Sequence, residues 1–243
     1  MSGRVAIVTG GTRGIGAAIS AHLLQQGYRV AAVYHSSDAA AEAFRRATGA
    51  EIFRWDVSSY EQCVDGVRCV RERFGTAVDI LINNAGITRD GMFHKSTPED
   101  WRVVIETNLL SCFNMTHAVI DGMRDQNWGR IINISSINAQ KGQLGQTNYC
   151  AAKAGLLGFT KALALENAKK GVTVNAIAPG YIDTDMVRAV PENVLQQIVA
   201  QIPVGRLGTS EEIAEAVSFL ISDKAGFMTG ATLTINGGQF MTP

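Results

Sequence analysis

Short apolar runs without polar alternation recur along the chain and predict strands that are buried on both faces. Arg4–Thr9 shows the pattern, because every residue between its two ends is apolar and most are β-branched. Runs of this kind are typical of parallel sheets that helices cover on both sides. Seven segments of strand character are predicted: Arg4–Thr9, Arg29–Tyr34, Glu51–Trp55, Asp79–Ile82, Arg130–Ser135, Thr173–Ala178 and Thr232–Ile235.

Helical patterns fill the intervals between these strands. After the first strand, Ile19 and Leu23 fall on one helical face, and Gly27 ends the helix as a C-terminal glycine does. Strands that alternate with helices predict an α/β protein with a doubly wound parallel sheet and helices on both faces. The length suits one domain, residues 1–243, without repeats or linkers. Other predicted helices include Ser59–Phe74, Pro98–Met123, Thr147–Lys170 and Ser210–Ser222.

Two stretches fit this alternation poorly. Residues 137–146 contain two glycines and three glutamines, and residues 181–208 contain two prolines among scattered apolar positions. Each follows the carboxyl end of a predicted strand, where open α/β sheets bind ligands. Long loops in compact domains are often functional. We therefore expect a substrate loop at about 137–146 and a mobile lid at about 181–208, with two plain surface loops as the alternative.

Charge and cysteine content narrow the classes of function. The chain has 22 basic and 22 acidic residues, a pI near 6.9 and no basic tract, which argues against a nucleic-acid partner. No apolar run approaches the roughly 18 residues of a membrane span. A strand that begins by Arg4 leaves no room for a signal peptide, so we expect a cytoplasmic protein. Four cysteines lack C-x-x-C or metal-ligand spacing, which predicts reduced thiols and no metal site.

A glycine-rich turn joins the first predicted strand to the first helix. Gly10, Gly14 and Gly16 follow the strand directly. In this context glycines let backbone N–H groups and the helix N-terminus approach a pyrophosphate. The turn therefore predicts a Rossmann-type dinucleotide site, with an ordinary strand-to-helix turn as the alternative.

Tyr149 and Lys153 are four residues apart, so a helix places both side chains on one face. A nearby ammonium favours the phenolate and is expected to lower the pKa of the Tyr149 phenol. A tyrosine tuned in this way donates a proton to a carbonyl oxygen or accepts one from an alcohol. Ser136 is placed to hold that oxygen. The three residues predict carbonyl reduction, although a half-buried tyrosine and a solvated lysine are the plain alternative.

The order of motifs resembles that of the short-chain dehydrogenase/reductase family over the whole chain. The glycine spacing follows the family fingerprint T-G-x-x-x-G-x-G, and the later motifs are Asn83-Asn84-Ala85-Gly86, Asn108, Asn133-Ile134-Ser135-Ser136, Tyr149-x-x-x-Lys153 and Pro179-Gly180. A closer resemblance is to the acetoacetyl-CoA reductases of polyhydroxyalkanoate synthesis, whose nearest relatives are 3-oxoacyl-[acyl-carrier-protein] reductases. That resemblance is carried by Asn83–Asp90, Trp128–Arg130, Gln140–Tyr149 and Asn236–Gly238.

The family resemblance implies a catalytic tetrad. Tyr149 would protonate the developing alkoxide, and Lys153 would hold the nicotinamide ribose. Ser136 would hydrogen-bond the substrate oxygen. Asn108 would bend its helix and anchor a water that leads from Lys153 to solvent. The implied cofactor-binding residues are Gly10, Thr12, Arg13, Gly14, Ile15, Gly16, His35, Asp56, Val57, Asn84, Ala85, Gly86, Ile87, Tyr149, Lys153, Pro179, Gly180 and Ile182.

The end of the second strand indicates which nicotinamide cofactor is used. An NAD enzyme places a carboxylate there for the ribose 2′-hydroxyl. The chain has Tyr34, His35 and Ser36 instead, and the nearby Asp38 reads as the start of a helix. Arg13 offers a guanidinium to a 2′-phosphate. The sequence therefore favours NADP(H).

The same resemblance implies a short acyl-CoA substrate. Gln143, Leu144 and Gln146 precede Tyr149, and Tyr181 follows the Pro-Gly motif, so these residues would meet the acyl group and thioester. Amide donors suit a neutral diketide carbonyl, and Leu144 would cap a short methyl end. Asp90, Ser136 and Tyr149 complete the expected substrate site.

Two other functions remain open from the sequence. A reductase of carrier-protein substrates would need a basic patch near the entrance. The sequence alone does not show whether Lys95, Arg102, Arg124 and Arg130 form such a patch. A catalytically silent NADPH-sensing protein would not need to keep the tetrad.

A homotetramer is expected, since the resemblance implies that the helices predicted at Pro98–Met123 and Thr147–Lys170 pair across a two-fold axis.

Overall fold

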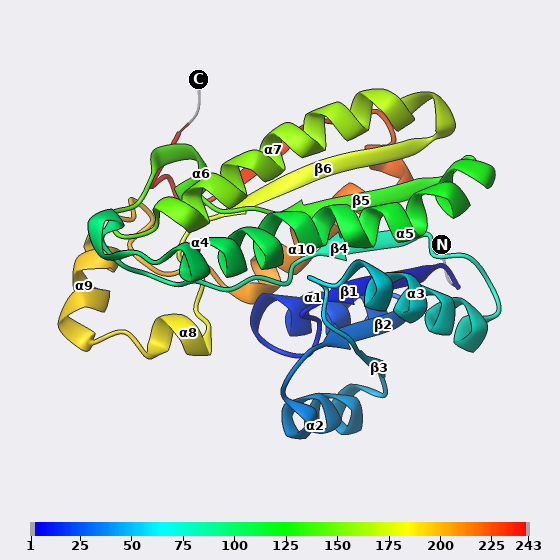
Figure 1. The fold of residues 1–243 in the computed structure, drawn as a ribbon, viewed down its shortest axis with the longest axis horizontal. Coiled ribbons are helices and arrows are strands. Elements are labelled where there is room, and N and C mark those ends of the chain that lie inside the picture. The colour runs from blue at the N-terminus through cyan, green and yellow to red at the C-terminus, as the bar shows by residue number, and fades with distance from the viewer. Residues whose placement is uncertain (1–2, 242–243) are drawn as a thin grey trace.

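A parallel sheet forms the centre of the computed structural model, which describes residues 3–241 (Figure 1). Within that range the sheet has seven strands in the order β3-β2-β1-β4-β5-β6-β7. The chain runs outward from β1 to β3 and then returns to the other side of β1, which confirms the predicted doubly wound fold. The strands are β1 (Val5–Thr9), β2 (Arg29–Tyr34), β3 (Glu51–Arg54), β4 (Ile80–Asn83), β5 (Gly129–Ile134), β6 (Val172–Pro179) and β7 (Thr232–Ile235).

Helices cover both faces of the sheet. On one face lie α3, α5 and α7, and on the other lie α1 and α10. Four shorter helices, α4, α6, α8 and α9, gather at one end of the molecule (Figure 1). The helices are α1 (Gly14–Gln25), α2 (Asp38–Thr48), α3 (Tyr60–Phe74), α4 (Pro98–Ile105), α5 (Ser111–Asp125), α6 (Asn138–Lys141), α7 (Thr147–Asn167), α8 (Asp185–Arg188), α9 (Glu192–Ala200) and α10 (Ser210–Ile221), with shorter helical segments η1 (Phe93–Lys95), η2 (Glu106–Leu110), η3 (Ala168–Lys170) and η4 (Asp223–Ala225).

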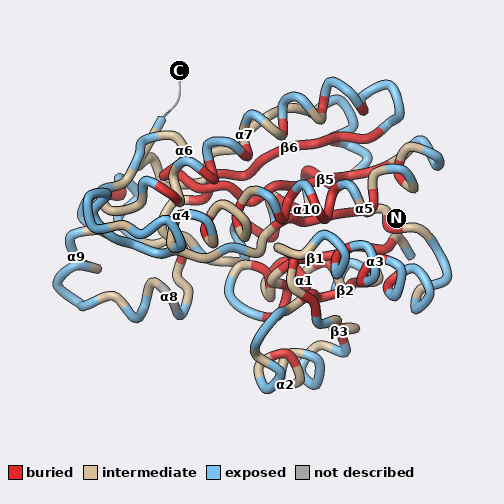
Figure 2. Tube along the Cα trace, viewed as in Figure 1, coloured by how far each residue is buried: buried red, intermediate tan, exposed pale blue. Residues whose placement is uncertain are grey.

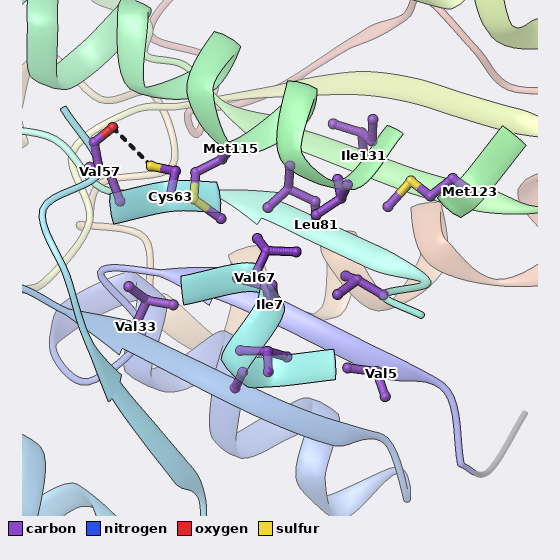
Figure 3. Packing of buried hydrophobic residues seen from close by; sticks show 14 of the residues in the cluster. Val5, Ile7, Val33, Val57, Cys63, Val67, Leu81, Met115, Met123 and Ile131 are labelled. Carbon is purple, nitrogen blue, oxygen red and sulfur yellow. Dashed lines mark hydrogen bonds between the residues drawn. The ribbon is translucent and has the colours of Figure 1, made fainter. Parts of the chain in front are cut away.

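Alternate residues of each strand build the two halves of the core. Val5 and Ile7 of β1 belong to the cluster beneath α3 and α5, whereas Ala6 and Val8 belong to the cluster beneath α1 and α10. Figure 3 shows the first cluster, in which Met115 of α5 is fully buried. Successive strand residues point to opposite faces. A strand covered on both sides is therefore apolar throughout, which explains the runs in the sequence.

Burial follows the same layers. The central strands are buried along their length, while the outer sides of the surrounding helices are exposed (Figure 2). β7, at one edge of the sheet, is only partly buried. The carboxyl ends of the central strands are therefore held by a buried core.

Most predicted boundaries hold to within a residue or two, but the predicted helix Thr147–Lys170 ends in the 3₁₀ segment η3, and another predicted helix is divided in its middle. The stretch expected as a single helix from Pro98 to Met123 consists of α4, the π-helical turn η2 and α5. Asn108 lies in η2, and its Nδ2 donates to the carbonyl oxygen of Val104 at 2.8 Å. A side chain that occupies the carbonyl four residues back displaces the regular backbone bond, and π-turns of this kind are common at functional sites.

One helix has the length and mean hydropathy of a membrane span, although the sequence contains no continuous apolar run of that length. The continuous helical stretch 98–125 is long and apolar enough to pass that test by length and composition. Within its most apolar window, 44% of the residues are buried inside the molecule. Its inner side packs against α3, β4 and β5, as the core helix of a sheet protein does.

The two irregular stretches contain short helices. Residues 137–146 include α6, and residues 181–208 include α8 and α9. Backbone bonds close the base of the second stretch: Asp183 N donates to Gly208 O at 2.8 Å, and Gly208 N donates to Tyr181 O at 2.9 Å. The ends of this segment are thus fixed, and α8 and α9 extend beyond them (Figure 1).

Candidate active site

A cleft of about 750 Å³ opens at the carboxyl ends of the strands. Its lining includes the segments that follow β1, β2, β3, β4, β5 and β6. In open α/β sheets ligands bind at this edge, near the point where the strand order reverses, which here lies between β1 and β4. Every residue predicted to bind the cofactor lines the cleft except Gly16.

The glycine turn allows backbone to approach backbone. Gly16 lies behind the turn, where a Cβ would collide with the carbonyl oxygen of Gly10. Gly10 itself has a φ of +63°, which disfavours any residue with a side chain. Helix α1 begins at Gly14 with no acidic side chain in its first turn. The positive end of the helix dipole therefore stays available for an anion in the cleft.

Hydrogen bonds attach the end of β4 to this turn. Thr9 Oγ1 accepts from the backbone N–H groups of Asn84 and Ala85 at 2.9 and 3.0 Å. The Asn84 side chain donates through Nδ2 to the carbonyl oxygen of Thr9 at 2.9 Å. Asn84 lines the cleft as predicted, but its amide turns back to hold the glycine turn in place.

Where the cleft meets the end of β2, that strand end contributes no free carboxylate to the described lining. Asp38 begins α2 and pairs with Arg54 at 3.3 Å, so its charge is matched away from the cleft lining. Arg54 also donates to the His35 carbonyl at 3.0 Å. His35 Nε2 lies 3.8 Å from Asp56 Oδ2, and Arg13, which also lines the cleft, is exposed.

Lys153 and Tyr149 lie in the first two turns of α7, beside the end of β5. Lys153 is only 3% exposed, and its ammonium donates to the carbonyl oxygen of Ile134 at 2.9 Å. The Ser135 hydroxyl donates to the backbone carbonyl of Lys153 at 2.9 Å. These bonds fix the start of α7 against β5, so that Ser136 and Tyr149 face the same cleft.

Asn108 approaches the same group from η2. Its Nδ2 donates to the Ile87 carbonyl at 2.9 Å, and its Oδ1 accepts from the Ile87 N–H at 3.2 Å. Only a glycine fits between Asn108 and Lys153, because a Cβ on Gly86 would lie 2.5 Å from Asn108 Oδ1 and 3.5 Å from Lys153 Nζ. The structure thus gathers the four predicted catalytic side chains around one end of the cleft, with Asn108 fully buried behind its lining.

The predicted lowering of the Tyr149 pKa is wrong for this arrangement. Burial raises the pKa of the Tyr149 phenol, and the charges of Cys150 and Asp90 raise it further, while a hydrogen bond from Ser136 lowers it. Burial also lowers the pKa of Lys153. The Lys153 ammonium is directed to the Ile134 carbonyl rather than to the phenol oxygen, so desolvation outweighs the expected charge effect.

The predicted substrate residues divide into two groups. Ser136, Gln146, Tyr149 and Tyr181 line the cleft, whereas Gln143 and Leu144 do not, and Leu144 is 80% exposed at the loop surface. The remaining predicted residue, Asp90, lies outside the lining but accepts from Gln146 Nε2 at 2.9 Å.

The loop after β4 is attached to the start of α7 by further bonds. Gly91 N donates to the Gly145 carbonyl at 2.8 Å, and Asn148 Nδ2 donates to the Arg89 carbonyl at 3.2 Å. Asn138, which no motif singles out, lines the cleft beside Ser136. Its only signal in the sequence is its place two residues after the serine.

Comparisons with known proteins agree with this geometry. A family model described as enoyl-(acyl carrier protein) reductase matches residues 10–239. The chain is 63% identical to an acetoacetyl-CoA reductase of Shinella zoogloeoides and 63% identical to one of Rhizobium meliloti, in each case over 98% of both chains. The chain belongs to the short-chain dehydrogenase/reductase family. A 3-oxoacyl-[acyl-carrier-protein] reductase of Pseudomonas aeruginosa is 46% identical over 100% of this chain and 99% of its own.

As a short-chain dehydrogenase/reductase, the protein is an oxidoreductase enzyme that uses a nicotinamide cofactor. The glycine cradle, too tight for a Cβ at Gly16, and the uncompensated N-terminus of α1 fit the pyrophosphate of such a cofactor. Among residues 3–241, no group of three or more His, Cys, Asp or Glu side chains is arranged to hold a metal ion.

Proposed function

We propose that the protein is an NADPH-dependent acetoacetyl-CoA reductase, which forms (R)-3-hydroxybutyryl-CoA for polyhydroxybutyrate synthesis. The observation that carries the proposal is the meeting of Ser136, Tyr149 and Lys153 at one end of the dinucleotide cleft. The full-length relatives at 63% identity that are named acetoacetyl-CoA reductase support this substrate. The R configuration rests on the family resemblance.

In the proposed reaction the bound nicotinamide supplies the hydride. Tyr149 donates its phenolic proton to the ketone oxygen, and its raised pKa keeps that proton in place at neutral pH. Ser136 donates a hydrogen bond to the same oxygen and stabilises the charge that develops there. Lys153 binds the nicotinamide ribose, and Asn108 anchors a water through which Tyr149 regains its proton.

The charges where the cleft meets the end of β2, the place proposed for the adenosine ribose, favour NADPH over NADH. The first carboxylate after β2 in the sequence, on Asp38, is paired with Arg54 and does not line the cleft, and the Asp56 carboxylate at the end of β3 faces His35. Arg13 and His35 line the cleft there, and a guanidinium binds phosphate strongly. The 2′-phosphate of NADPH therefore has a cationic partner, whereas the 2′-hydroxyl of NADH finds no carboxylate at the end of β2 itself.

The acyl end of the substrate is assigned to the cleft between the glutamine-rich loop and Tyr181. Gln146 and Tyr181 line it, and Asp90 is hydrogen-bonded to Gln146. We assign the substrate loop to 137–146 and the lid to 181–208, and Gln143 and Leu144 reach the substrate only if the loop moves inward.

The protein is proposed to act as a cytoplasmic homotetramer. A groove of about 470 Å³ lies between α5 and α7 and is lined by apolar side chains that include Phe113, Ile120, Phe159 and Leu163. Phe113 is 46% exposed, which leaves a large apolar surface for a second copy to cover. A monomer mass by light scattering at micromolar concentration would reject the tetramer.

The carrier-protein reductase remains the second candidate, because relatives at 46% identity carry that name. The four basic residues considered from the sequence do not form a patch at the entrance. Arg102 pairs with Glu99, Arg124 donates to Asn167, and Arg130 is buried against Trp128. The fourth residue, Lys95, lies on η1 in the loop that follows β4. An acidic carrier protein therefore finds no basic surface built from these residues.

The test is a comparison of kcat/KM for acetoacetyl-CoA and for the acetoacetyl carrier-protein thioester, with each of the two nicotinamide cofactors. The proposal expects the highest value for acetoacetyl-CoA with NADPH. A preference for the carrier protein, or for thioesters of eight carbons or more, would move the protein to the second candidate. Cofactor binding without turnover of any thioester would favour the silent NADPH sensor.

A further inference from the structure

A chain of hydrogen bonds runs from Ser136 through Asn138 to the loop after β4. The backbone N–H of Asn138 donates to Ser136 Oγ at 3.1 Å. The side-chain Nδ2 of Asn138 donates to Gln146 Oε1 at 2.9 Å, and Gln146 Nε2 donates to Asp90 Oδ2 at 2.9 Å. These bonds join two segments that are far apart in the sequence, residues 136–146 and the loop after β4, at the substrate end of the cleft.

Asn138 is an uncommon residue for its surroundings. Only 9% of it is exposed, and its Oδ1 is buried without a hydrogen-bond partner among residues 3–241. An unpaired buried acceptor destabilises a fold, and an apolar residue of similar shape would avoid that loss. We infer that the hydrogen bond from Asn138 Nδ2 is worth more to the protein than the loss caused by the unpaired Oδ1.

The donor-to-acceptor direction of the hydrogen bonds between Asn138, Gln146 and Asp90 shows what the Asn138 side chain does. The Asp90 carboxylate only accepts hydrogen bonds, so it takes the Nε2 of Gln146. Gln146 Oε1 must then point away from Asp90, toward Asn138 Nδ2. With both ends of the amide held, Gln146 keeps one N–H and one lone pair in a fixed direction for a ligand.

The backbone of Asn138 acts on the serine. Because Ser136 Oγ accepts the Asn138 N–H, its own proton is left to point elsewhere. Ser136 and Tyr149 both line the cleft, so the serine hydroxyl is free to donate to a ligand oxygen there. Gln146 directly precedes α7, three residues before Tyr149, so the same chain ties the serine to the start of that helix.

We propose that Asn138 is a positioning residue, which fixes the amide of Gln146 for the thioester arm and the hydroxyl of Ser136 for the ketone oxygen. The inference rests on the proposed acetoacetyl-CoA reduction. It assigns to Asn138 no contact with the reacting atoms, because it acts through its two neighbours. Its effect should therefore appear in the use of acetoacetyl-CoA and leave NADPH affinity unchanged.

A double-mutant cycle tests the role of the side chain. Asn138→Ala keeps the backbone N–H but removes the donor to Gln146, so kcat/KM for acetoacetyl-CoA should fall about two- to tenfold, as for one hydrogen bond. Gln146→Ala should give a similar loss, and the double variant should be no worse than the poorer single variant. Losses that multiply, or an equal weakening of NADPH binding, would overturn the proposal.

A charge reversal keeps the test decisive if Asn138→Ala folds poorly. Asn138→Asp places a carboxylate against Gln146 Oε1 and should be worse than the alanine variant. Adding Asp90→Asn reverses the polarity of the chain, because the Gln146 amide then turns, donates to the new carboxylate at position 138 and accepts from the new amide at position 90. The double variant should regain at least part of the lost kcat/KM. Absence of any recovery would contradict the proposed chain.

A matched control loosens the same short helix on its other side. Gln140 of α6 donates to Thr234 Oγ1 at 3.2 Å, outside the chain described above. Thr234→Val removes that anchor and should leave kcat/KM within about twofold of wild type. A loss equal to that of Asn138→Ala would mean that any loosening of α6 lowers kcat/KM, which would overturn the specific role of Asn138.

Two outcomes separate this inference from the proposed function. If the wild-type enzyme does not reduce acetoacetyl-CoA, the proposed function itself fails, whereas normal turnover with an additive cycle rejects only the role of Asn138.

Discussion

Replacing Gly86 by alanine tests how tightly the catalytic group is packed. The new Cβ would lie 2.5 Å from Asn108 Oδ1 and 3.5 Å from Lys153 Nζ. Asn108 is fully buried and has no free path aside, because its amide is bonded to both polar groups of the Ile87 backbone and to the Val104 carbonyl. Overpacking a filled site costs about 1–3 kcal/mol. We expect a loss of that size in the free energy of unfolding, and a larger proportional loss of kcat.

The assay is thermal unfolding at fixed protein concentration, together with kcat/KM for acetoacetyl-CoA. For a chain of this size, each 1 kcal/mol lowers Tm by roughly 2–4 °C. Gly122→Ala in α5 is the matched control, since its Cβ would meet only Ala77 Cβ at an ordinary 3.5 Å. That helical replacement should stabilise by up to about 1 kcal/mol. If Gly86→Ala unfolds and turns over like the wild type, Asn108 is not held where the structure has it.

Three further predictions concern single side chains. Tyr149→Phe should fold and bind NADPH but lose roughly 10²–10⁴ in kcat, and a variant that kept about a third of wild-type kcat would refute the acid role. Arg13→Ala should raise KM for NADPH far more than KM for NADH, since a charged hydrogen bond of about 1.5–3 kcal/mol is lost, and equal effects would exclude Arg13 from 2′-phosphate recognition. Asp90 raises the pKa of Tyr149, and the neutral phenol is the proton donor. Asp90→Asn should therefore lower the pH above which the reduction rate falls. A pH profile of kcat/KM measures this limit, and a limit that stayed or rose would contradict the prediction.

The fold and the cofactor end of the cleft were predictable because their signals are local. Apolar runs mark strands that are buried on both faces, and Gly10 and Gly16 mark a turn that excludes side chains. Once the strands are parallel, their carboxyl ends share one edge, so motifs distant in the sequence must meet there. That rule alone places Asn84 beside the glycine turn and Ser136 beside Tyr149.

The electrostatics of the site were not predictable, because burial depends on the whole fold. The spacing of Tyr149 and Lys153 places them on one side of α7, but it does not reveal that the Ile134 carbonyl takes the ammonium. It also does not reveal that burial sets the direction of the Tyr149 pKa shift. The role of Asn138 was not predictable for a similar reason, since it depends on hydrogen bonds to Gln146 and on to Asp90 that form only when the loops are folded.

The central claim is that this cleft reduces the ketone of acetoacetyl-CoA with NADPH from one face. The most direct measurement is to incubate the enzyme with acetoacetyl-CoA and NADPH, follow NADPH oxidation, and determine the configuration of the product by chiral analysis. The account predicts stoichiometric oxidation and a product that is almost entirely (R)-3-hydroxybutyryl-CoA. A predominantly S product would contradict the proposed placement of the ketone between Ser136, Tyr149 and the nicotinamide, and no turnover would contradict the function itself.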